Sequence, residues 1–309
     1  MKIREILAPG NETRIDSALD KLIEVKKELE ERYFELLGNG ESQELDDVQR
    51  EIADINDEIH EVAQQIVGPH SALWHQITTE CSQALEAIKN TGHWIMRGVK
   101  GSPGIMFQGA SRLVRNPRDS DIKTSIMFNH CLTELGFKAR RDNSIFVTAY
   151  RPQASEFGPV YLIFPKNGFD YTYANQGDMT LNESDMKYMY DTKLLDKLQQ
   201  YLKTLQSDPK TSLQADISRA GNAVGNALFY WIMTFSTQEV AQFEKETGVN
   251  LDWRKYIDLE KFQRKYKPAN RDLEYALMAS MEIYVRGEYI ALQKSVFDAA
   301  VSAQIKSHR

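Results

Sequence analysis

The sequence is poor in the residues that build disulfide-rich and zinc-binding proteins. It has two cysteines, Cys81 and Cys131, among 309 residues, and they do not have the spacing of metal ligands. The six histidines form no pair of the HxxxH type. We therefore expect neither a disulfide framework nor a metal site.

Long apolar runs are missing as well. No run reaches the roughly 18 residues that are needed to cross a lipid bilayer. The first residues, MKIREILAPGN, include a basic residue but have no apolar core and no cleavage site of a signal peptide. We expect no membrane contact and no secretion by a signal peptide.

The chain also lacks the basic excess of a protein that binds nucleic acid over its whole surface. Its 38 Lys and Arg residues stand against 44 Asp and Glu residues, a net charge of −6, whereas a polyanion is bound by a basic face. Two short basic stretches, RLVRNPRDSD and FKARRD, keep a local nucleic-acid contact open as an alternative. The motifs GxGxxG after a strand, Walker A, GxSxG and HExxH are absent, so the common nucleotide-binding and hydrolase folds fit poorly.

What the sequence does contain begins with two helices whose apolar residues repeat at heptad spacing. These residues are Ile15, Leu19, Leu22, Leu29, Tyr33 and Leu36, followed by Leu45, Val48, Ile52, Ile55, Ile59, Val62 and Ile66. The breaker GNGESQ between them predicts an antiparallel hairpin over residues 12–67. Ser71 is predicted to cap a third helix that runs to about Lys89. We expect residues 1–92 to be a structural coiled-coil arm; the alternative is that the arm binds a protein partner or oligomerises.

From His93 onward, short β-type runs replace the heptads. The runs HWIMRGV, SIFVTAY, VYLIFP and FDYTYA are separated by Gly, Pro and Asn, as strands are. A helix from about Ile122 to Leu135 interrupts them and ends at Gly136. Near the end, a strand region at Ala279–Leu292 precedes a short helix. The pattern predicts an α+β domain over residues 93–309, with a helical insertion at about 186–270.

Arg97 is the first of three polar side chains that interrupt β-type runs. It follows Trp94 and Ile95, which we expect in a strand, and it directly precedes Gly98. A guanidinium fork at the end of a strand could hold a phosphate or a ribose. An ordinary surface arginine at a strand end would give the same pattern.

Ser144 and Glu282 are the other two. Ser144 and Thr148 flank Phe146, and the two-residue period of a strand points all three to one face. Two hydroxyl groups beside a ring could hold a ribose, although the exposed face of an edge strand would look the same. Glu282 alternates with Tyr284 in the run MEIYVRGEY, and a solvent-facing residue would also explain it.

The order of these three residues carries more information than each one alone. An arginine on an early strand, a serine beside an aromatic residue on a middle strand and a glutamate on a late strand resemble the Arg–Ser–Glu arrangement of the ADP-ribosyltransferase fold. The segments MRGV, FQGASRLVRNPRDSD, LGFKARRDNSIFVTA and FGPVYLIFP are similar to those of a bacteriophage-encoded family related to that fold. The resemblance covers about residues 93–180 and 279–292, and Phe157–Gly158 stands where that family has Tyr-Gly. The helical arm and the block at 190–270 lie outside it.

The resemblance implies a split, strongly bent β-sheet of the ADP-ribosyltransferase type, with NAD bound as a substrate between its halves. It implies that Glu282, Ser144 and Arg97 are catalytic: the glutamate stabilises an oxocarbenium-like ribose, the serine orients the glutamate, and the arginine anchors NAD. The residues implied in NAD binding are Arg97, Gly98, Arg115, Arg118, Asp119, Ser144, Phe146 and Thr148. Asp178 is the second choice for the catalytic carboxylate, and no metal is implied.

The function implied is that of a phage-encoded, NAD-dependent ADP-ribosyltransferase-like protein. It would cleave the nicotinamide–ribose bond and modify a host macromolecule whose identity the sequence does not give. Such a protein would work in the host cytoplasm or be packaged in a virion. The alternative is a non-enzymatic virion or assembly protein that uses the same fold as an inactive scaffold.

Overall fold

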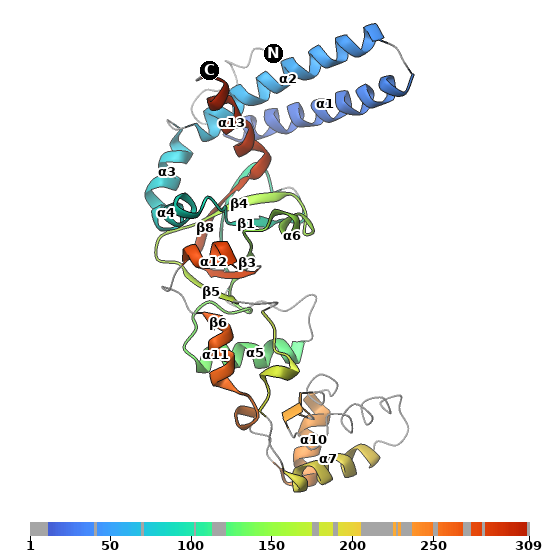
Figure 1. The fold of residues 1–309 in the computed structure, drawn as a ribbon, viewed down its shortest axis with the longest axis vertical. Coiled ribbons are helices and arrows are strands. Elements are labelled where there is room, and N and C mark those ends of the chain that lie inside the picture. Colours follow the sequence, from blue (N-terminus) through green and yellow to red (C-terminus); the bar gives the residue numbers. More distant parts are fainter. Residues whose placement is uncertain are drawn as a thin grey trace. The chain divides into compact units, whose positions relative to one another are not determined.

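In the computed structural model the chain is an α+β protein with two four-stranded β-sheets (Figure 1). The structure describes residues 12–39, 42–68, 71–101, 103–112, 122–174, 179–187, 191–204, 225–226, 228–229, 237–249, 253–267, 273–279 and 282–307. The chain divides into two compact units. Unit 1 comprises Met1–Ala110, Val147–Phe169 and Gly287–Arg309, and unit 2 comprises Ser111–Phe146 and Asp170–Arg286.

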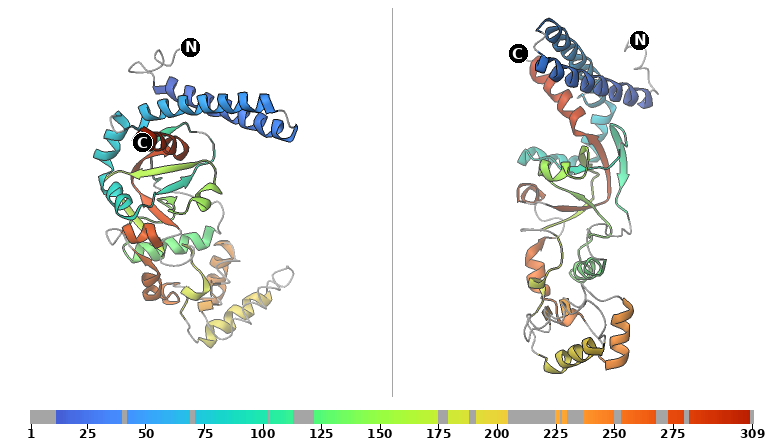
Figure 2. Two further views of the ribbon diagram at one scale, coloured as in Figure 1. Left: turned by 45° about the horizontal axis from the view of Figure 1, so that its top comes forward. Right: turned by 90° about the vertical axis from the view of Figure 1, so that its right-hand side faces the viewer.

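Unit 1 begins with a hairpin of two long helices, α1 (Glu12–Asn39) and α2 (Ser42–Val67), which lie side by side in Figures 1 and 2. The two helices predicted from the heptads are thus confirmed. Every heptad position from Leu45 to Ile66 is buried or half-buried, because these side chains face the partner helix. Near the turn that joins the helices, Arg32 Nη2 lies 2.6 Å from Glu44 Oε1 and links α1 to α2.

The base of the hairpin shares a hydrophobic core with the first sheet and the last helix, α13 (Lys294–Ser307). Ile59, Val62 and Val67 of α2 pack in the same cluster as Phe297 of α13. The Gln64 side chain also donates a hydrogen bond of 2.6 Å to the Ala300 carbonyl. Because of this shared core, the first compact unit extends past residue 92, where the sequence suggested that the arm ends.

The third helix is two helices, α3 (Ala72–Glu80) and α4 (Ser82–Thr91), so the prediction of one continuous helix was wrong. The predicted cap is confirmed, since Ser71 Oγ accepts a hydrogen bond from Trp74 N at 3.0 Å. The break falls at Cys81, whose backbone leaves the helical region at φ −121° and ψ 23°. A new helix can start there because Asn167 Oδ1 accepts the hydrogen bond of Gln83 N, at 3.0 Å.

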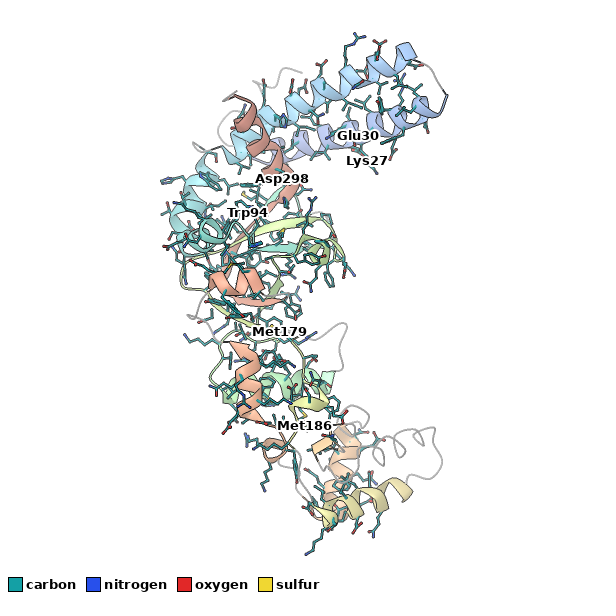
Figure 3. The ribbon with its side chains drawn as sticks, viewed as in Figure 1. Lys27, Glu30, Trp94, Met179, Met186 and Asp298 are labelled. Carbon is teal, nitrogen blue, oxygen red and sulfur yellow. The ribbon has the colours of Figure 1, made fainter. Side chains whose placement is uncertain are left out.

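The first sheet lies in unit 1 and has the strand order β1-β4-β8-β2. All three pairings are antiparallel, and β4 and β8 at the centre are almost wholly buried. The strands are β1 (Met96–Gly98), β2 (Met106–Ala110), β4 (Val160–Pro165) and β8 (Glu288–Gln293). A five-residue helix, α6 (Arg151–Ser155), lies against β1. Trp94, labelled in Figure 3, packs between Phe164 of β4 and Phe297 of α13, at ring distances of 6.3 and 4.7 Å.

The second sheet lies mainly in unit 2 and has the order β3-β7-β5-β6. Its strands are β3 (Ile145–Val147), β5 (Asp170–Ala174), β6 (Tyr266–Lys267) and β7 (Ile283–Arg286). The chain passes between the sheets in two short connections. Four residues join β4 to β5, and Gly287, at a φ of 142°, joins β7 to β8. A side chain at Gly287 would be strained because few L residues adopt that φ.

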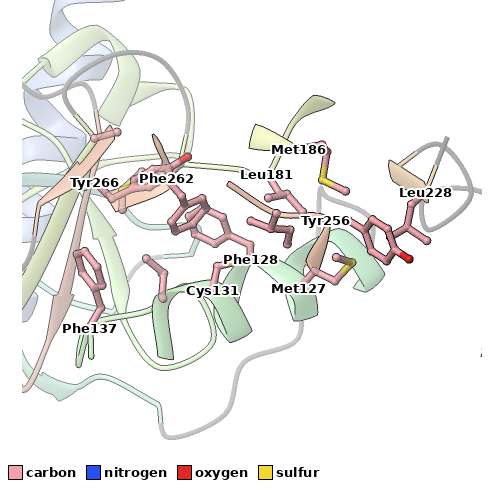
Figure 4. Close-up of a cluster of buried hydrophobic side chains, with 14 of the residues drawn as sticks. Met127, Phe128, Cys131, Phe137, Leu181, Met186, Leu228, Tyr256, Phe262 and Tyr266 are labelled. Atoms are coloured by element: carbon pink, nitrogen blue, oxygen red, sulfur yellow. The ribbon is translucent and has the colours of Figure 1, made fainter. Parts of the chain in front are cut away.

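Among the described helices of unit 2, α5 (Ile122–Glu134), α7 (Thr192–Thr204), α10 (Thr237–Thr247) and α11 (Leu259–Lys265) contribute to a second core (Figure 4). Unit 2 also contains α12 (Leu273–Ala279) and the short 3-10 turns η2 (Glu183–Asp185) and η3 (Trp253–Lys255). Phe128 of α5 makes edge-to-face contacts with Phe262, Tyr266 and Tyr284, at ring distances of 5.4, 5.2 and 6.4 Å. The predicted helix at Ile122–Leu135 is confirmed to within one residue, and Gly136 ends it at a φ of 77°. Helix α12 occupies Ala279, where a strand was expected.

Candidate functional site

Arg97 lies on β1, an edge strand of the first sheet, directly opposite Tyr161 of β4. The strand begins at Met96, so Trp94 and Ile95 precede it. The prediction that these two residues belong to the strand was wrong. Ile95 nevertheless continues the ladder, because its carbonyl accepts a hydrogen bond from Ile163 N at 2.8 Å. Arg97 is half-buried, which differs from a fully exposed arginine at a strand end.

Gly98 is required by the packing of α6 on β1. A Cβ atom added to Gly98 would meet the Ala154 carbonyl oxygen at 2.0 Å and Phe157 Cβ at 2.9 Å. Contacts this short with backbone atoms cannot be relieved by turning a side chain. This packing by itself accounts for the glycine after Arg97.

The hydroxyl residues around β3 are buried, so the interpretation as an exposed polar face is wrong. Ser144 is 3% exposed and Thr148 is 5% exposed. Ser144 Oγ donates a hydrogen bond to Asn143 Oδ1 at 3.1 Å, and Thr148 Oγ1 accepts one from Tyr150 N at 3.0 Å. Thr148 also pairs with Met96 through two backbone hydrogen bonds of 2.8 Å, which brings it beside the strand of Arg97 in unit 1.

Ser144 and Glu282 each directly precede a strand of the second sheet. Phe146 of β3 stacks on Tyr284 of β7 with a ring distance of 4.7 Å and an interplanar angle of 25°. Ser144 precedes Phe146 by two residues, and Glu282 precedes Tyr284 by two, a spacing that in extended backbone points side chains to the same side. Glu282 is half-buried and is therefore not a fully solvent-facing residue. A carboxylate and a hydroxyl beside stacked rings are groups that can hold a ribose.

Ionisable side chains gather around Tyr266 of the same sheet. Burial raises the pKa of the Tyr266 hydroxyl, and the negative charges of Asp185 and Glu282 raise it further. Burial also raises the pKa of the Cys131 thiol to about 12, with the charge of Asp185 as the next cause. Asp185 itself is 0% exposed, and its Oδ2 lies 3.5 Å from Lys265 Nζ. Sequence reasoning missed this buried carboxylate, because no local pattern marks Asp185 as interior.

Arg141 belongs to two of the stretches quoted in the sequence analysis, FKARRD and LGFKARRDNSIFVTA, but no role was assigned to it there. Its Nη1 donates hydrogen bonds to the Met179 carbonyl at 3.2 Å and to the Tyr284 hydroxyl at 3.3 Å. The Tyr284 hydroxyl donates to the same Met179 carbonyl at 2.9 Å, and Tyr266 donates to the Thr180 carbonyl at 2.9 Å. These three side chains hold the 179–180 backbone; Figure 3 labels Met179.

Four of the residues implied by the resemblance, Arg115, Arg118, Asp119 and Asp178, lie outside the described residues. In the part of the chain that is described, no group of three or more His, Cys, Asp and Glu side chains could hold a metal ion. No described helix is both long and apolar enough to cross a membrane. Comparisons with protein families, with curated proteins and with solved structures find no match for this chain.

Proposed function

We propose that the chain is a phage-encoded, NAD-dependent ADP-ribosyltransferase-like protein that cleaves the nicotinamide–ribose bond and transfers ADP-ribose to a host macromolecule. The observation that carries the proposal is the stacked pair of Phe146 and Tyr284, with Ser144 and Glu282 each two residues before one of the rings and each at least half-buried. Two four-stranded sheets, connected by the short segments between β4 and β5 and between β7 and β8, are in keeping with the type of fold that the sequence resembles.

In the proposed reaction the bond between C1′ of the ribose and the nicotinamide nitrogen breaks, and nicotinamide leaves with the bonding electron pair. The positive charge that develops on the ribose is stabilised by the carboxylate of Glu282. The nucleophile of the acceptor then attacks C1′ and gives up its proton. Ser144 would orient the carboxylate of Glu282 relative to the ribose. Phe146 would lie against one side of the ribose ring.

The test is the release of nicotinamide from NAD, with the full chain alone and with host lysate. Glu282→Gln should lower turnover by about 100-fold or more. It should change NAD affinity little, since the amide keeps the shape and can still bond to a ribose hydroxyl. The matched control is Glu260→Gln, which removes the same charge from an exposed position of unit 2. No nicotinamide release under any condition, or equal turnover in both variants, would refute the proposal.

Arg97 remains a predicted NAD-binding residue. Arg97→Lys should preserve folding and weaken NAD binding, because an ammonium group cannot reproduce the guanidinium fork. Equal NAD affinity in the two forms would show that Arg97 has no part in binding.

The second candidate is a non-enzymatic virion or assembly protein. The hydrogen bonds of Ser144 and Thr148 to their own loops and the packing of Gly98 favour it, because these explain the residues without a ligand. A chain that binds no NAD and yet co-purifies with assembled virions would support this candidate.

A further inference from the structure

Arg141 lies in the loop between α5 and β3, in unit 2, and its guanidinium is fixed on one side only. Both of its hydrogen bonds leave from Nη1. The guanidinium carbon lies 5.2 Å from the centre of the Phe146 ring, which itself stacks on Tyr284. The contact with the Phe146 ring and the two hydrogen bonds from Nη1 fix the plane of the Arg141 guanidinium. The free end of the group therefore points in one direction.

The neighbouring cations each have a carboxylate, and Arg141 does not. Lys138 Nζ and Arg286 Nη1 lie 3.4 and 3.6 Å from the two oxygens of Asp170. Arg140 Nε lies 3.2 Å from Asp142 Oδ1. Within the described ranges, no carboxylate lies within 4.0 Å of Arg141. Three cations therefore pair with two carboxylates, and the partly buried guanidinium of Arg141 pairs with none among the described residues.

The donors of Arg141 that find no protein acceptor form one edge of its guanidinium. Its Nε is buried without a hydrogen-bond partner, and its Nη2 makes no hydrogen bond to the described residues. Nε–H and Nη2–H point the same way and together form the side-on fork that binds two oxygens of a carboxylate or a phosphate. A buried donor without an acceptor costs about 1–3 kcal/mol, so a group that supplies an acceptor there binds favourably.

We propose that Arg141 is the residue of unit 2 that binds an anionic ligand, with its side-on fork facing two oxygens of a phosphate or diphosphate group. That the phosphate belongs to NAD rests on the proposed function, whereas the anion site itself does not. In an NAD complex, Arg141 would hold the diphosphate and Phe146 would fix the direction of the guanidinium. Inorganic pyrophosphate and free ADP-ribose both carry a diphosphate. Comparing their binding with that of NAD shows whether the site takes any diphosphate or only the diphosphate of a nucleotide.

The experiment is a calorimetric titration of the full chain with pyrophosphate, ADP-ribose and NAD. Arg141→Gln should weaken the binding of all three by about tenfold or more, because it removes a charge-assisted bidentate contact. Arg141→Lys keeps the charge and a donor for the Met179 carbonyl, and it should restore only part of the affinity. The matched control is Arg140→Gln, one residue away, whose partner is Asp142; it should change affinity by less than about twofold.

The two variants of Arg141 keep the test decisive if the glutamine form unfolds, since the lysine form preserves the contact with the 179–180 backbone. Absence of pyrophosphate binding to the wild type, or unchanged affinity in the Arg141 variants, overturns the anion site. Pyrophosphate binding that needs Arg141, in a chain that releases no nicotinamide from NAD, supports the anion site and counts against the proposed function. Nicotinamide release that is unaffected by Arg141→Gln supports the proposed function and counts against the anion site.

Discussion

Replacing Ile59 by alanine tests whether the helical hairpin and the first sheet fold as one body. Ile59 is 8% exposed and belongs to the cluster that also holds Phe164 of β4 and Phe297 of α13. The matched position is Ile52, two turns earlier in the same helix. It is half-buried, and it is not among the side chains that pack against this cluster. The two substitutions remove the same atoms from different surroundings.

The magnitude follows from burial. Truncating a buried isoleucine to alanine costs about 2–5 kcal/mol, through lost transfer free energy and the cavity left behind. Ile59→Ala should lie within this range, and Ile52→Ala near or below its lower end, because part of its side chain already meets water. With a urea slope of about 1–3 kcal/mol per molar, a loss of about 3 kcal/mol lowers the unfolding midpoint by about 1 M or more.

The assay is urea unfolding followed by two probes. Far-UV circular dichroism reports the helices, and tryptophan fluorescence reports the core in part, since two of the four tryptophans, Trp74 and Trp94, have their rings against Phe297. We expect Ile59→Ala to lower both midpoints together. If Ile59→Ala lowered the midpoint of the circular dichroism transition and left the midpoint of the fluorescence transition unchanged, the hairpin would be an independent arm. The shared core would then be refuted.

Further predictions concern a glycine, two thiols and a tyrosine. Gly98→Ala should destabilise the chain by about 1–3 kcal/mol, since a Cβ there meets the Ala154 carbonyl at 2.0 Å; an unchanged urea midpoint would contradict the packing of α6 on β1. Stability should fall as the pH rises above about 9, because the pKa values of Cys81 and Cys131 are raised by burial from 9.0 to about 11 and about 12, so the unfolded chain releases these protons first. The decline between about pH 8 and pH 10 should be smaller in the double variant Cys81→Ala/Cys131→Ala; an equal decline would contradict the burial of the thiols. Tyr284→Phe should cost about 0.5–1.5 kcal/mol in the same assay, because the Met179 carbonyl loses one of its two donors and keeps Arg141; no change would show that this hydrogen bond contributes nothing.

The parts of the fold that the sequence predicted well depend on local periodicity. The heptads gave both helices of the hairpin, and Ser71 and Gly136 marked helix ends, because each of these signals acts within a few residues. The β-type runs at 160–165 and 170–174 are strands for the same reason. The break at Cys81 could not be predicted in this way, because it depends on Asn167, a residue 84 positions from Gln83.

The candidate site was predicted only in part. Ser144, Phe146 and Glu282 stood out because a polar residue interrupts a β-type run, and the structure adds that Phe146 stacks on Tyr284, two residues after Glu282. Gly98 stood out too, although its packing against Ala154 and not a ligand accounts for it. Arg141 could not be told apart from Arg140 in the sequence. In the structure Arg140 lies beside the carboxylate of Asp142, and no carboxylate of the described residues lies within 4.0 Å of Arg141. Only the fold decides this difference.

The sequence by itself determined the elements with a strong period, namely the two helices of the hairpin, the helix at Ile122–Glu134 and the strands at 160–165 and 170–174. These follow from the 3.6-residue and two-residue periods of the backbone. Tertiary structure alone decided which elements share a core, as α13 and the base of the hairpin do, and which charges are paired. It also buried Asp185 completely, although its neighbours in sequence are polar. The physical reason is that burial and ion pairing are set by atoms far away along the chain, and no local pattern records them.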